Sequence, residues 1–385
     1  MSPPLICMLE GFLLVLALIT SAGLLLMAWG AFTAHYDTKI TFLPSVDIII
    51  AARNEEQRIE ACLESISRLT YPKQLLHVVV VDDRSTDATP SIIAGFASRY
   101  PWISLLKATP ETGQLRGKTN AVTQGIEATH GEIILFTDAD CEIPPGWVEN
   151  TVKYYTEENV GVVGGFTSLA GRSGFREMQA LDWFFLFSAA AGLVRIGFPV
   201  TAVGTNLSVR RSAYLSVGGY RTIPFSVTED YALFHAITHG GIYRARIPRE
   251  PATLTVSYPC DSWDELYLQK KRWFAGGKGM SLGTIGLFAI PYLLNVVLLV
   301  GLVTDPAAIV LPLVMKVVSE LLVVFPSLIT FRRLSLLRSF LFFEVYFFIY
   351  VLVYPPMVLL TDAVIWKERG YGGAPEAENT NAPSV

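Results

Sequence analysis

The sequence predicts an α/β domain with a mostly parallel sheet, flanked by hydrophobic membrane segments. The first observation is an uneven distribution of charge: residues 44–279 carry 48 of the 64 Asp, Glu, Lys and Arg side chains. The other 149 residues carry the remaining 16. The second is a mean hydropathy of +0.42, which excludes a disordered chain. The third is an alternation of short apolar runs with helical patterns between residues 46 and 137.

Four apolar runs in the charged part of the chain read as strands, at residues 46–51, 76–81, 103–106 and 132–137. Helical patterns separate them at 55–69, 87–98 and 119–128. Nearly continuous apolar strands that alternate with helices are typical of a parallel sheet covered on both faces. Such sheets bind ligands beyond the carboxyl ends of their strands.

The hydrophobic parts of the chain predict a membrane protein. Residues 11–34 contain no charged side chain, and 24 residues can span about 30 Å of hydrocarbon. A signal peptide is the alternative, but it needs a basic start and no Lys or Arg precedes Lys39. Further segments run over 279–304, 306–331 and 339–366. We therefore expect an anchor at 1–36, a globular domain at 44–280, a membrane domain of about three segments at 281–366 and a flexible tail at 367–385.

Two features of the membrane segments leave alternatives open. Lys316 and Glu320 are four residues apart, so a helix places them on one face, either paired with each other or touching a polar head group. Pro355 and Pro356 should break or kink the last segment. That segment either spans once or turns back.

Charge and cysteine content suggest where the domain resides. Arg332, Arg333 and Arg338 make the loop between the last two segments basic, whereas the N-terminal residues have no early Lys or Arg. The positive-inside rule then places the domain and this loop in the cytoplasm of an integral plasma- or inner-membrane protein. Four scattered cysteines fit a reducing compartment. A net charge of −4 without a basic stripe argues against nucleic-acid binding.

Polar side chains follow three of the predicted strands, at residues 52–55, 82–85 and 138–140. No glycine-rich phosphate loop follows the first strand, so a dinucleotide enzyme or a P-loop NTPase is disfavoured. Carboxylates tolerate a phosphate when a divalent cation bridges them, and Asp138 and Asp140 are spaced to face the same side. The alternative is that this acidic pair only caps a helix or forms a turn.

With these features the chain resembles the membrane-anchored family 2 glycosyltransferases, which include cellulose and hyaluronan synthases and ceramide glucosyltransferases. The resemblance covers about residues 44–280 and rests on motifs in order: IIIAARNEE (48–56), VVVVDDRSTDAT (78–89), GKTNAV (117–122), TDAD (137–140), GTNLSVRR (204–211), TED (228–230) and QKKRW (269–273). It implies a GT-A fold, a Rossmann-like nucleotide-sugar-binding domain, flanked by transmembrane helices.

The resemblance also implies roles for individual residues. The implied donor-binding residues are Ala52, Glu55, Asp83, Lys118 and Asp138. Asp140, with Asp138, is implied as the ligand of Mg²⁺ or Mn²⁺. Asp230 is implied as the general base of an inverting transfer, and Arg272 as a stabiliser of the leaving diphosphate. The implied acceptor and diphosphate residues are Glu229, Gln269, Arg272 and Trp273.

Two helical segments near the membrane have competing interpretations. Helical spacing puts Gln269, Arg272 and Trp273 on one face, which offers an amide, a planar phosphate binder and an aromatic platform. Lys270, Lys271 and Lys278 are expected to anchor the same helix at the membrane surface. Residues 173–198 are expected to form an amphipathic helix on the membrane near the acceptor, and a buried core helix is the alternative.

Three functions remain open from the sequence. The favoured one is transfer of a sugar, with glucose from UDP-glucose expected, to a lipid hydroxyl. The second is processive polysaccharide synthesis, which usually uses more membrane spans than this chain offers. The third is a non-catalytic nucleotide-sugar-binding subunit. The expected partners are a UDP-sugar, a lipid or glycan acceptor and the lipid bilayer, and the sequence leaves the oligomeric state open.

Overall fold

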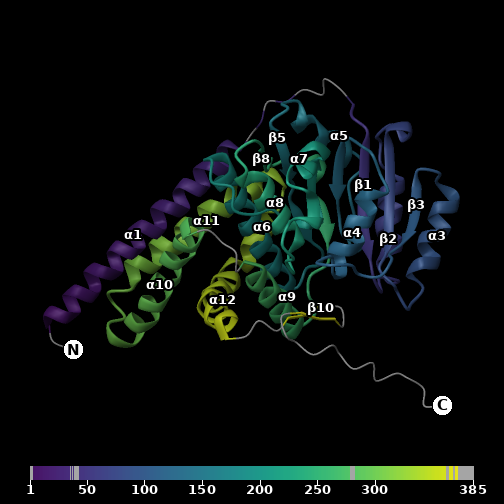
Figure 1. Cartoon of the computed structure of the whole chain (residues 1–385). Helices are drawn as coiled ribbons and strands as arrows, with labels where there is room; N and C mark the ends of the chain where they lie inside the picture. Colours follow the sequence, from purple (N-terminus) through teal and green to yellow (C-terminus); the bar gives the residue numbers. More distant parts are fainter. Residues whose placement is uncertain are drawn as a thin grey trace, which may run out of the picture.

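The structure is a computed structural model that describes residues 3–34, 36, 38, 43–277, 282–360, 364–366 and 369–371. Within these residues one large sheet has the strand order β3-β2-β1-β4-β7-β5-β8 (Figure 1). Its strands are β1 Val46–Ala52, β2 Leu76–Asp82, β3 Ile103–Lys107, β4 Ile133–Phe136, β5 Val160–Gly164, β7 Leu207–Arg210 and β8 Arg244–Arg246.

All four predicted strands are confirmed, and they pair in parallel as β3-β2-β1-β4. β7 runs antiparallel to both β4 and β5, so the sheet is mostly parallel with one reversed strand. Two small sheets complete the strand set of the described residues. They pair β6 (Thr167–Leu169) with β9 (Thr255–Ser257), and β10 (Val364–Trp366) with β11 (Arg369–Tyr371).

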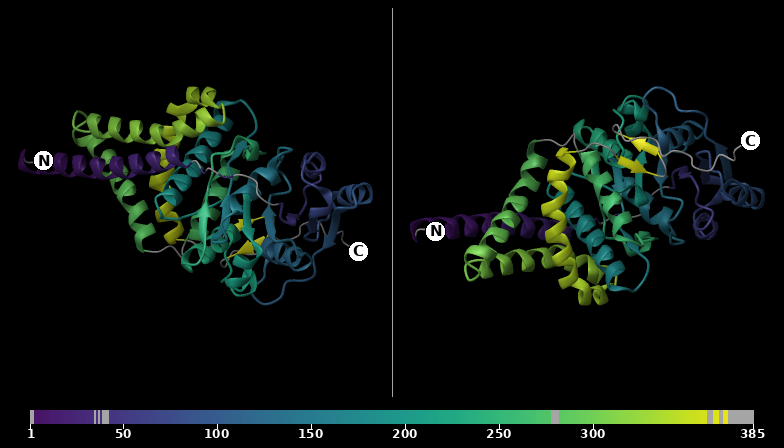
Figure 2. Two further views of the ribbon diagram at one scale, coloured as in Figure 1. Left: turned by 90° about the horizontal axis from the view of Figure 1, so that it is seen from above. Right: turned by 90° about the horizontal axis from the view of Figure 1, so that it is seen from below.

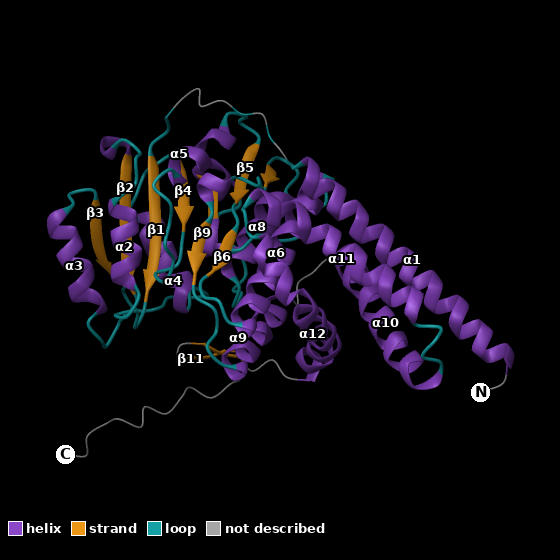
Figure 3. Ribbon diagram, turned by 180° about the vertical axis from the view of Figure 1, so that it is seen from behind, coloured by secondary structure: helices purple, strands orange, loops and turns teal. Residues whose placement is uncertain are grey.

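Helices cover both faces of the sheet, as Figure 3 shows from behind. The α-helices of this part are α2 Ile59–Ser67, α3 Thr89–Arg99, α4 Gly117–Glu127, α5 Trp147–Val152, α6 Gly174–Arg195, α7 Arg211–Ser216, α8 Glu229–His239 and α9 Trp263–Gly276. Short 3-10 turns are η1 Lys73–Leu75, η2 Lys153–Tyr155, η3 Gly204–Asn206, η4 Gly219–Arg221 and η5 Pro251–Thr253. The three predicted helices exist, although α2 begins later than expected because residues 54–56 bond to the loop after β2.

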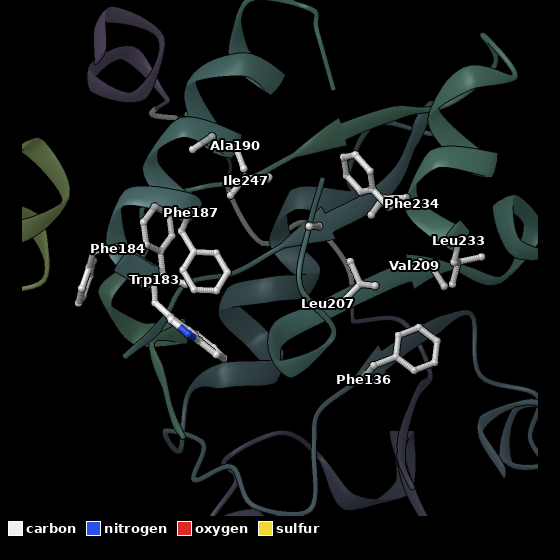
Figure 4. Packing of buried hydrophobic residues seen from close by; sticks show 14 of the residues in the cluster. Phe136, Trp183, Phe184, Phe187, Ala190, Leu207, Val209, Leu233, Phe234 and Ile247 are labelled. Atoms are coloured by element: carbon white, nitrogen blue, oxygen red, sulfur yellow. The ribbon is translucent and has the colours of Figure 1, made fainter. Parts of the chain in front are cut away.

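Alternation along β1 divides the core into two layers. Ile48 and Ile50 pack with α2 and α3 on one face, whereas Ile49 packs with α4 on the other. The second layer continues into α6, whose aromatic side chains Trp183, Phe184 and Phe187 lie in one cluster with the sheet residues (Figure 4).

The expectation that residues 173–198 lie on the membrane surface is wrong, because α6 is a core helix. Most of its side chains are buried, including the polar Glu177, Gln179 and Asp182. It packs on β6 on one side and on the hydrophobic helices α1, α11 and α12 on the other. An apolar helix with few charges is equally compatible with both environments, so composition could not separate them.

The hydrophobic segments form long helices, α1 Pro3–Thr33, α10 Leu282–Thr304, α11 Val310–Thr330 and α12 Phe340–Leu360, with a 3-10 turn η7 Leu334–Ser339 before α12. Within the described residues four helices are long and apolar enough to cross a membrane. Pro355 and Pro356 do not break the helix, since α12 runs through both prolines to Leu360, and a kink there stays a prediction. Next to the prolines, Tyr354 packs on Tyr267 and Phe274 of α9.

The charged residues inside these helices form a buried cluster. Lys316 Nζ lies 2.6 Å from Glu320 Oε2 and 3.2 Å from Glu344 Oε2. The predicted Lys316–Glu320 pair is therefore present, and Glu344 of α12 joins it. All three side chains are less than a tenth exposed, so the cluster ties α11 to α12 away from water.

Candidate active site

Lys118 lies at the centre of a charged cluster at the carboxyl ends of β1 and β4. Its Nζ is 2.7 Å from Asp138 Oδ1 and 2.8 Å from Glu229 Oε1. Helix α4 presents the lysine, the tail of β4 presents Asp138, and the first turn of α8 presents Glu229. Although burial opposes protonation, the carboxylates of Asp138, Glu229 and Asp230 raise the pKa of Lys118 above its usual range. The lysine therefore holds a fixed positive charge among three acidic groups.

Asp230 is the carboxylate best prepared for proton transfer in this cluster. Its Oδ2 accepts a hydrogen bond of 2.6 Å from the Gly204 amide, and its Oδ1 accepts one of 2.8 Å from the Tyr231 amide. Burial and the neighbouring Glu229 raise the pKa of Asp230 to about 6. A carboxyl group with that pKa can accept a proton at neutral pH and is a stronger base than an ordinary aspartate.

A small cavity of about 10 Å³ lies over this cluster. Its lining includes Lys118, Asp138, Gly204, Glu229 and Asp230. Gly204 is close enough to Asp230 that an added Cβ would lie 3.2 Å from the carboxylate oxygen Oδ2, so a larger residue would crowd the carboxyl group. The structure thus brings together four predicted site residues, Lys118, Asp138, Glu229 and Asp230, from three motifs at one cavity.

The residues implied for the nucleoside lie at the neighbouring strand ends. Ala52 and Asp83 are buried, and the Asp83 amide donates a 2.8 Å hydrogen bond to the Ala52 carbonyl. The Glu55 amide donates to Thr89 Oγ1 at 2.8 Å, which joins the loop after β1 to the start of α3. Asp82 Oδ1 accepts a hydrogen bond from the Ser85 amide, which stabilises the loop after β2. These hydrogen bonds hold the loops after β1 and β2 together at the edge of the sheet.

Asp140 lies apart from the Lys118 cluster, although it is two residues from Asp138. Its Oδ2 is 3.8 Å from Arg58 Nη1 and accepts a 3.4 Å hydrogen bond from Ser257 Oγ. About a quarter of the Asp140 side chain and 30% of the Asp138 side chain are exposed. Both carboxylates can therefore be reached from solvent.

The donor set fits a metal that is held partly by substrate. Among the residues that the structure describes, no group of three or more His, Cys, Asp or Glu side chains is arranged to hold an ion by itself. Mg²⁺ and Mn²⁺ at nucleotide sites commonly use one or two protein carboxylates together with phosphate oxygens. Two reachable carboxylates at a strand end satisfy that requirement.

Helix α9 carries the QKKRW motif beside α6. The rings of Trp273 and Trp183 lie 5.7 Å apart, and Trp273 packs against the main core. Gln269 Oε1 is buried and has no hydrogen-bond partner within the described residues. A buried amide oxygen without a partner is costly unless a ligand or water supplies a donor, which suits a group facing a substrate.

The expectation that Lys270 anchors the helix in the membrane surface is wrong. Its side chain is 1% exposed, its ammonium pairs with Asp182 of α6, and it lies 4.1 Å from the centre of the Trp273 ring. Lys271 is half-buried, and Lys278 lies outside the described residues. From the sequence, Lys270 is expected to be an exposed cation because it lies in a polar motif before a hydrophobic segment. Its burial is explained by the facing carboxylate of Asp182 on α6.

A close contact connects α9 to the Asp230 loop. An added Cβ at Gly276 would lie 1.9 Å from Thr228 Oγ1, so only glycine allows the end of α9 to approach the TED segment this closely. The helix that carries the implied diphosphate-binding arginine is therefore in van der Waals contact with Thr228 of the TED segment. Arg272 and Trp273 lie within one helical turn of that contact.

Sequence reasoning missed several residues that build this site. Gly204, which bonds Asp230, belongs to the GTNLSVRR motif but had no predicted role. Asn206 of the same motif is buried and accepts a hydrogen bond from Trp147 while donating to two backbone carbonyls. Asp182 had no signal, because its partner Lys270 is 88 residues away in sequence.

Comparison with known proteins agrees with this geometry. The chain matches Glycosyl transferase family 2 over residues 47–218 and Glycosyl transferase family group 2 over residues 133–366, more than half of its length. A beta-monoglucosyldiacylglycerol synthase of Nostoc sp. is 30% identical over 257 residues, which are 63% of this chain and 51% of the relative. A poly-beta-1,6-N-acetyl-D-glucosamine synthase of Staphylococcus aureus is 24% identical over 249 residues, which are 63% of this chain and 56% of the relative. The chain thus spans about half the length of the curated relatives it matches.

A solved structure shares the fold. The mannosyltransferase PcManGT of Pyrobaculum calidifontis, determined with GDP-Man and Mn2+, aligns with a TM-score of 0.57 and 22% identity. The alignment covers 88% of this chain and 99% of that protein. The mostly parallel sheet, the acidic strand ends and the two family matches together identify the chain as a member of glycosyltransferase family 2 with a GT-A fold.

Proposed function

We propose that this protein is an inverting, metal-dependent membrane glycosyltransferase that moves a sugar, which we take to be glucose, from a UDP-sugar to a lipid hydroxyl. The observation that carries the proposal is the Asp230 carboxylate. It is buried beside Lys118, aligned by two backbone amides, and its pKa is raised to about 6. A hydroxyl acceptor must lose a proton as it attacks the sugar, and Asp230 is the base for that proton.

The positive groups around the cavity serve the leaving diphosphate. Lys118 carries a charge stabilised by three carboxylates, and α9 brings Arg272 close to the TED segment. Fixed cations that face developing negative charge lower the barrier because they need no rearrangement during the reaction. One base and a leaving group on the opposite side of the sugar give inversion at the anomeric carbon.

Asp140 and Asp138 would hold the divalent ion together with the diphosphate. When bound, the ion supplies positive charge that stabilises the leaving nucleoside diphosphate. The exposure of both carboxylates and the Mn2+ named with the mannosyltransferase support this assignment. Ala52, Glu55 and Asp83 would contact the nucleoside at the adjacent strand ends.

The acceptor is proposed to be a lipid because hydrophobic helices adjoin the catalytic domain. Packing of α6 on both the sheet and the apolar helices puts the QKKRW helix next to them. Such a position lets an apolar acceptor meet a water-soluble donor, with the domain on the cytoplasmic side. The similarity to a monoglucosyldiacylglycerol synthase supports a lipid hydroxyl acceptor and a glucosyl donor.

Incubation of the purified protein with radiolabelled UDP-glucose, Mg²⁺ and total membrane lipid tests the proposal. A discrete labelled glycolipid is expected, and it should be lost in Asp230→Asn. A product of high molecular weight would favour the second candidate, a polysaccharide synthase, which the similarity to a poly-N-acetylglucosamine synthase supports. Tight nucleotide binding with no labelled product from any UDP-sugar would favour the non-catalytic subunit.

A further inference from the structure

Helix α12 has the composition of a membrane span but not the surroundings of one. Glu344 is its only charged residue, and its 21 residues are long enough to cross a bilayer. Its neighbours, however, include the domain helices α6 and α9 as well as the hydrophobic helices α10 and α11. A helix that crosses the bilayer must leave the domain, as α1 and α11 do.

The start of α12 is held at the catalytic domain. Ser339 Oγ, directly before the helix, donates a 2.6 Å hydrogen bond to Glu177 Oε2 of α6, and Arg338 Nε donates to the same oxygen at 2.9 Å. In the first turns, the rings of Phe343 and Phe347 lie 6.0 and 5.0 Å from Phe185 of α6.

The second half of α12 stays beside α9. Trp263 at the start of α9 contacts Tyr346, with ring centres 6.2 Å apart. Phe274 at its end contacts Tyr350 and Tyr354, at 5.5 and 5.8 Å. Residues from both the start and the end of α9 thus contact α12, so the two helices pack against each other along most of α9.

The chain also returns to the domain after α12. Strand β10, which begins at Val364, lies against α9. Both ends of α12 are therefore on the same side of the molecule, next to the helix that carries QKKRW.

The other hydrophobic helices behave differently. The domain end of α1 is fixed by Arg195 and Arg249, which donate to the Thr33 and Phe32 carbonyls. Its opposite end meets the α10–α11 connection around a cavity of about 180 Å³. That cavity is lined by Leu9, Glu10, Leu13, Gly301, Thr304, Asp305 and Ala308 and by no residue of the domain. Figure 2 shows α1 and α11 extending away from the domain while α12 runs across them.

The outward face of α12 is a continuous aliphatic stripe. Leu341, Val345, Ile349 and Val353 are 76%, 55%, 54% and 42% exposed, and their spacing of four residues puts them on one helix face. The opposite face carries the aromatic residues that pack on α6 and α9. A stripe of this kind fits the acyl chains of a bilayer, as do the exposed apolar side chains of α10 and α11.

We infer that α12 lies in the leaflet on the catalytic side, roughly parallel to the membrane surface, and does not cross the bilayer. Of the described helices, α1, α10 and α11 are then the crossings, and the segment that follows α12 is on the same side as the catalytic domain. The inference rests on the membrane insertion proposed above but not on the reaction or its acceptor. In this position α12 presents an apolar surface next to α9, along which a lipid acceptor can reach the QKKRW motif.

Labelling of single cysteines with a membrane-impermeant maleimide tests the sidedness in sealed, inside-out vesicles. In a chain whose native cysteines are replaced by serine, Ser98→Cys on α3 marks the domain side and Asp305→Cys marks the opposite side. A cysteine at Ala382 in the tail should be labelled together with Ser98→Cys and not with Asp305→Cys. Labelling of the tail together with Asp305→Cys would overturn the inference.

Depth measurements on the aliphatic stripe provide a second, independent test. Spin labels at Leu341, Val345, Ile349 and Val353 share one face, so their accessibility to oxygen reports depth directly. A helix parallel to the surface gives nearly equal depths at the four positions. A crossing helix gives a steady change, because 12 residues rise about 18 Å along a helix. That gradient would contradict the inference.

Extraction of the membranes with alkaline carbonate distinguishes a failure of this inference from a failure of the proposed function. Release of the full-length protein from membranes by alkaline carbonate would show that the chain is not inserted at all, which overturns both. Retention in the membrane with a tail on the far side overturns only the position of α12 and leaves the transferase assignment untouched.

Discussion

Two lysines in this protein have nearly the same neighbours but different surroundings. Lys118 lies 2.7 and 2.8 Å from carboxylates of Asp138 and Glu229, and Lys316 lies 2.6 and 3.2 Å from those of Glu320 and Glu344. The Lys118 side chain is 21% exposed at a cavity, whereas the Lys316 side chain is 3% exposed between helices. The difference teaches that access to solvent, rather than the pairing of charges, distinguishes the cluster proposed to be catalytic from the one buried between helices.

The largest expected effect is the loss of catalysis in Asp230→Asn. Removing a general base typically lowers turnover by about 10²–10⁴-fold. Binding of the nucleotide, measured by calorimetry with UDP and Mg²⁺, should change little, because Asp230 is proposed to contact the acceptor. Glu64→Gln, an exposed carboxylate on α2, is the matched control and should retain full activity. Turnover within threefold of the native protein would remove Asp230 as the base.

The next effect concerns stability in the structural cluster. Lys316→Met leaves two buried carboxylates without their cation, and breaking such a cluster costs about 3–5 kcal/mol of unfolding free energy. Thermal unfolding in detergent should show the loss, with transfer per folded molecule unchanged. The triple variant Lys316→Met, Glu320→Leu, Glu344→Leu should recover stability, since it removes every buried charge of the cluster. A decrease in donor affinity in Lys316→Met would break the distinction between the two clusters.

Lys118→Met is the corresponding change in the reactive cluster. Hydrogen bonds to charged groups contribute about 1.5–3 kcal/mol, so the KM for the UDP-sugar should rise about 10–100-fold. The same substitution at Lys316 should leave KM unchanged, which makes the two variants controls for each other. An equal effect of both variants on KM would argue that Lys118 is structural too.

The smallest expected effect is a shift in the midpoint of the pH dependence of kcat/KM. Burial and Glu229 raise the pKa of Asp230 to about 6, and the base must be ionised. Activity should therefore fall as the pH decreases through about 6. Glu229→Gln removes one like charge, so the midpoint should move to lower pH by up to about one unit, equivalent to about 1.4 kcal/mol. A midpoint that stays fixed in Glu229→Gln would mean that another group controls the profile.

The same pKa has a consequence for folding. Because the folded-state pKa of Asp230 is above its unfolded value, protonation stabilises the fold, and that stabilisation is lost as the pH rises through about 6. Asn is neutral at every pH, so the melting temperature of Asp230→Asn should match the native protein near pH 5 and exceed it near pH 8. A lower melting temperature at pH 8 would contradict the desolvation of this carboxyl group.

Much of the fold could be predicted from local pattern. The runs VDIIIA and LHVVVV have strand character that tertiary packing did not change, and both strands lie where they were expected. The acidic tails of β1, β2 and β4 followed from parallel topology. The reversed strand β7 was not predicted, because it is short and its pairing depends on partners far away in the chain. The roles of Gly204 and Thr228 were also hidden, since each acts through a contact with a distant motif.

The sequence by itself determined which segments are apolar, which strands are buried and which motifs carry carboxylates, because these properties depend on side-chain chemistry and short-range period. Only the tertiary structure decided how hydrophobic segments of similar composition pack on the rest of the protein. The spans containing α11 and α12 have the same mean hydropathy of 1.9, yet α11 packs mainly on α1 and α6, whereas α12 packs on both α6 and α9. The physical reason is that hydrophobic burial has no direction, whereas the contacts of α12 with Glu177, Phe185 and Phe274 do.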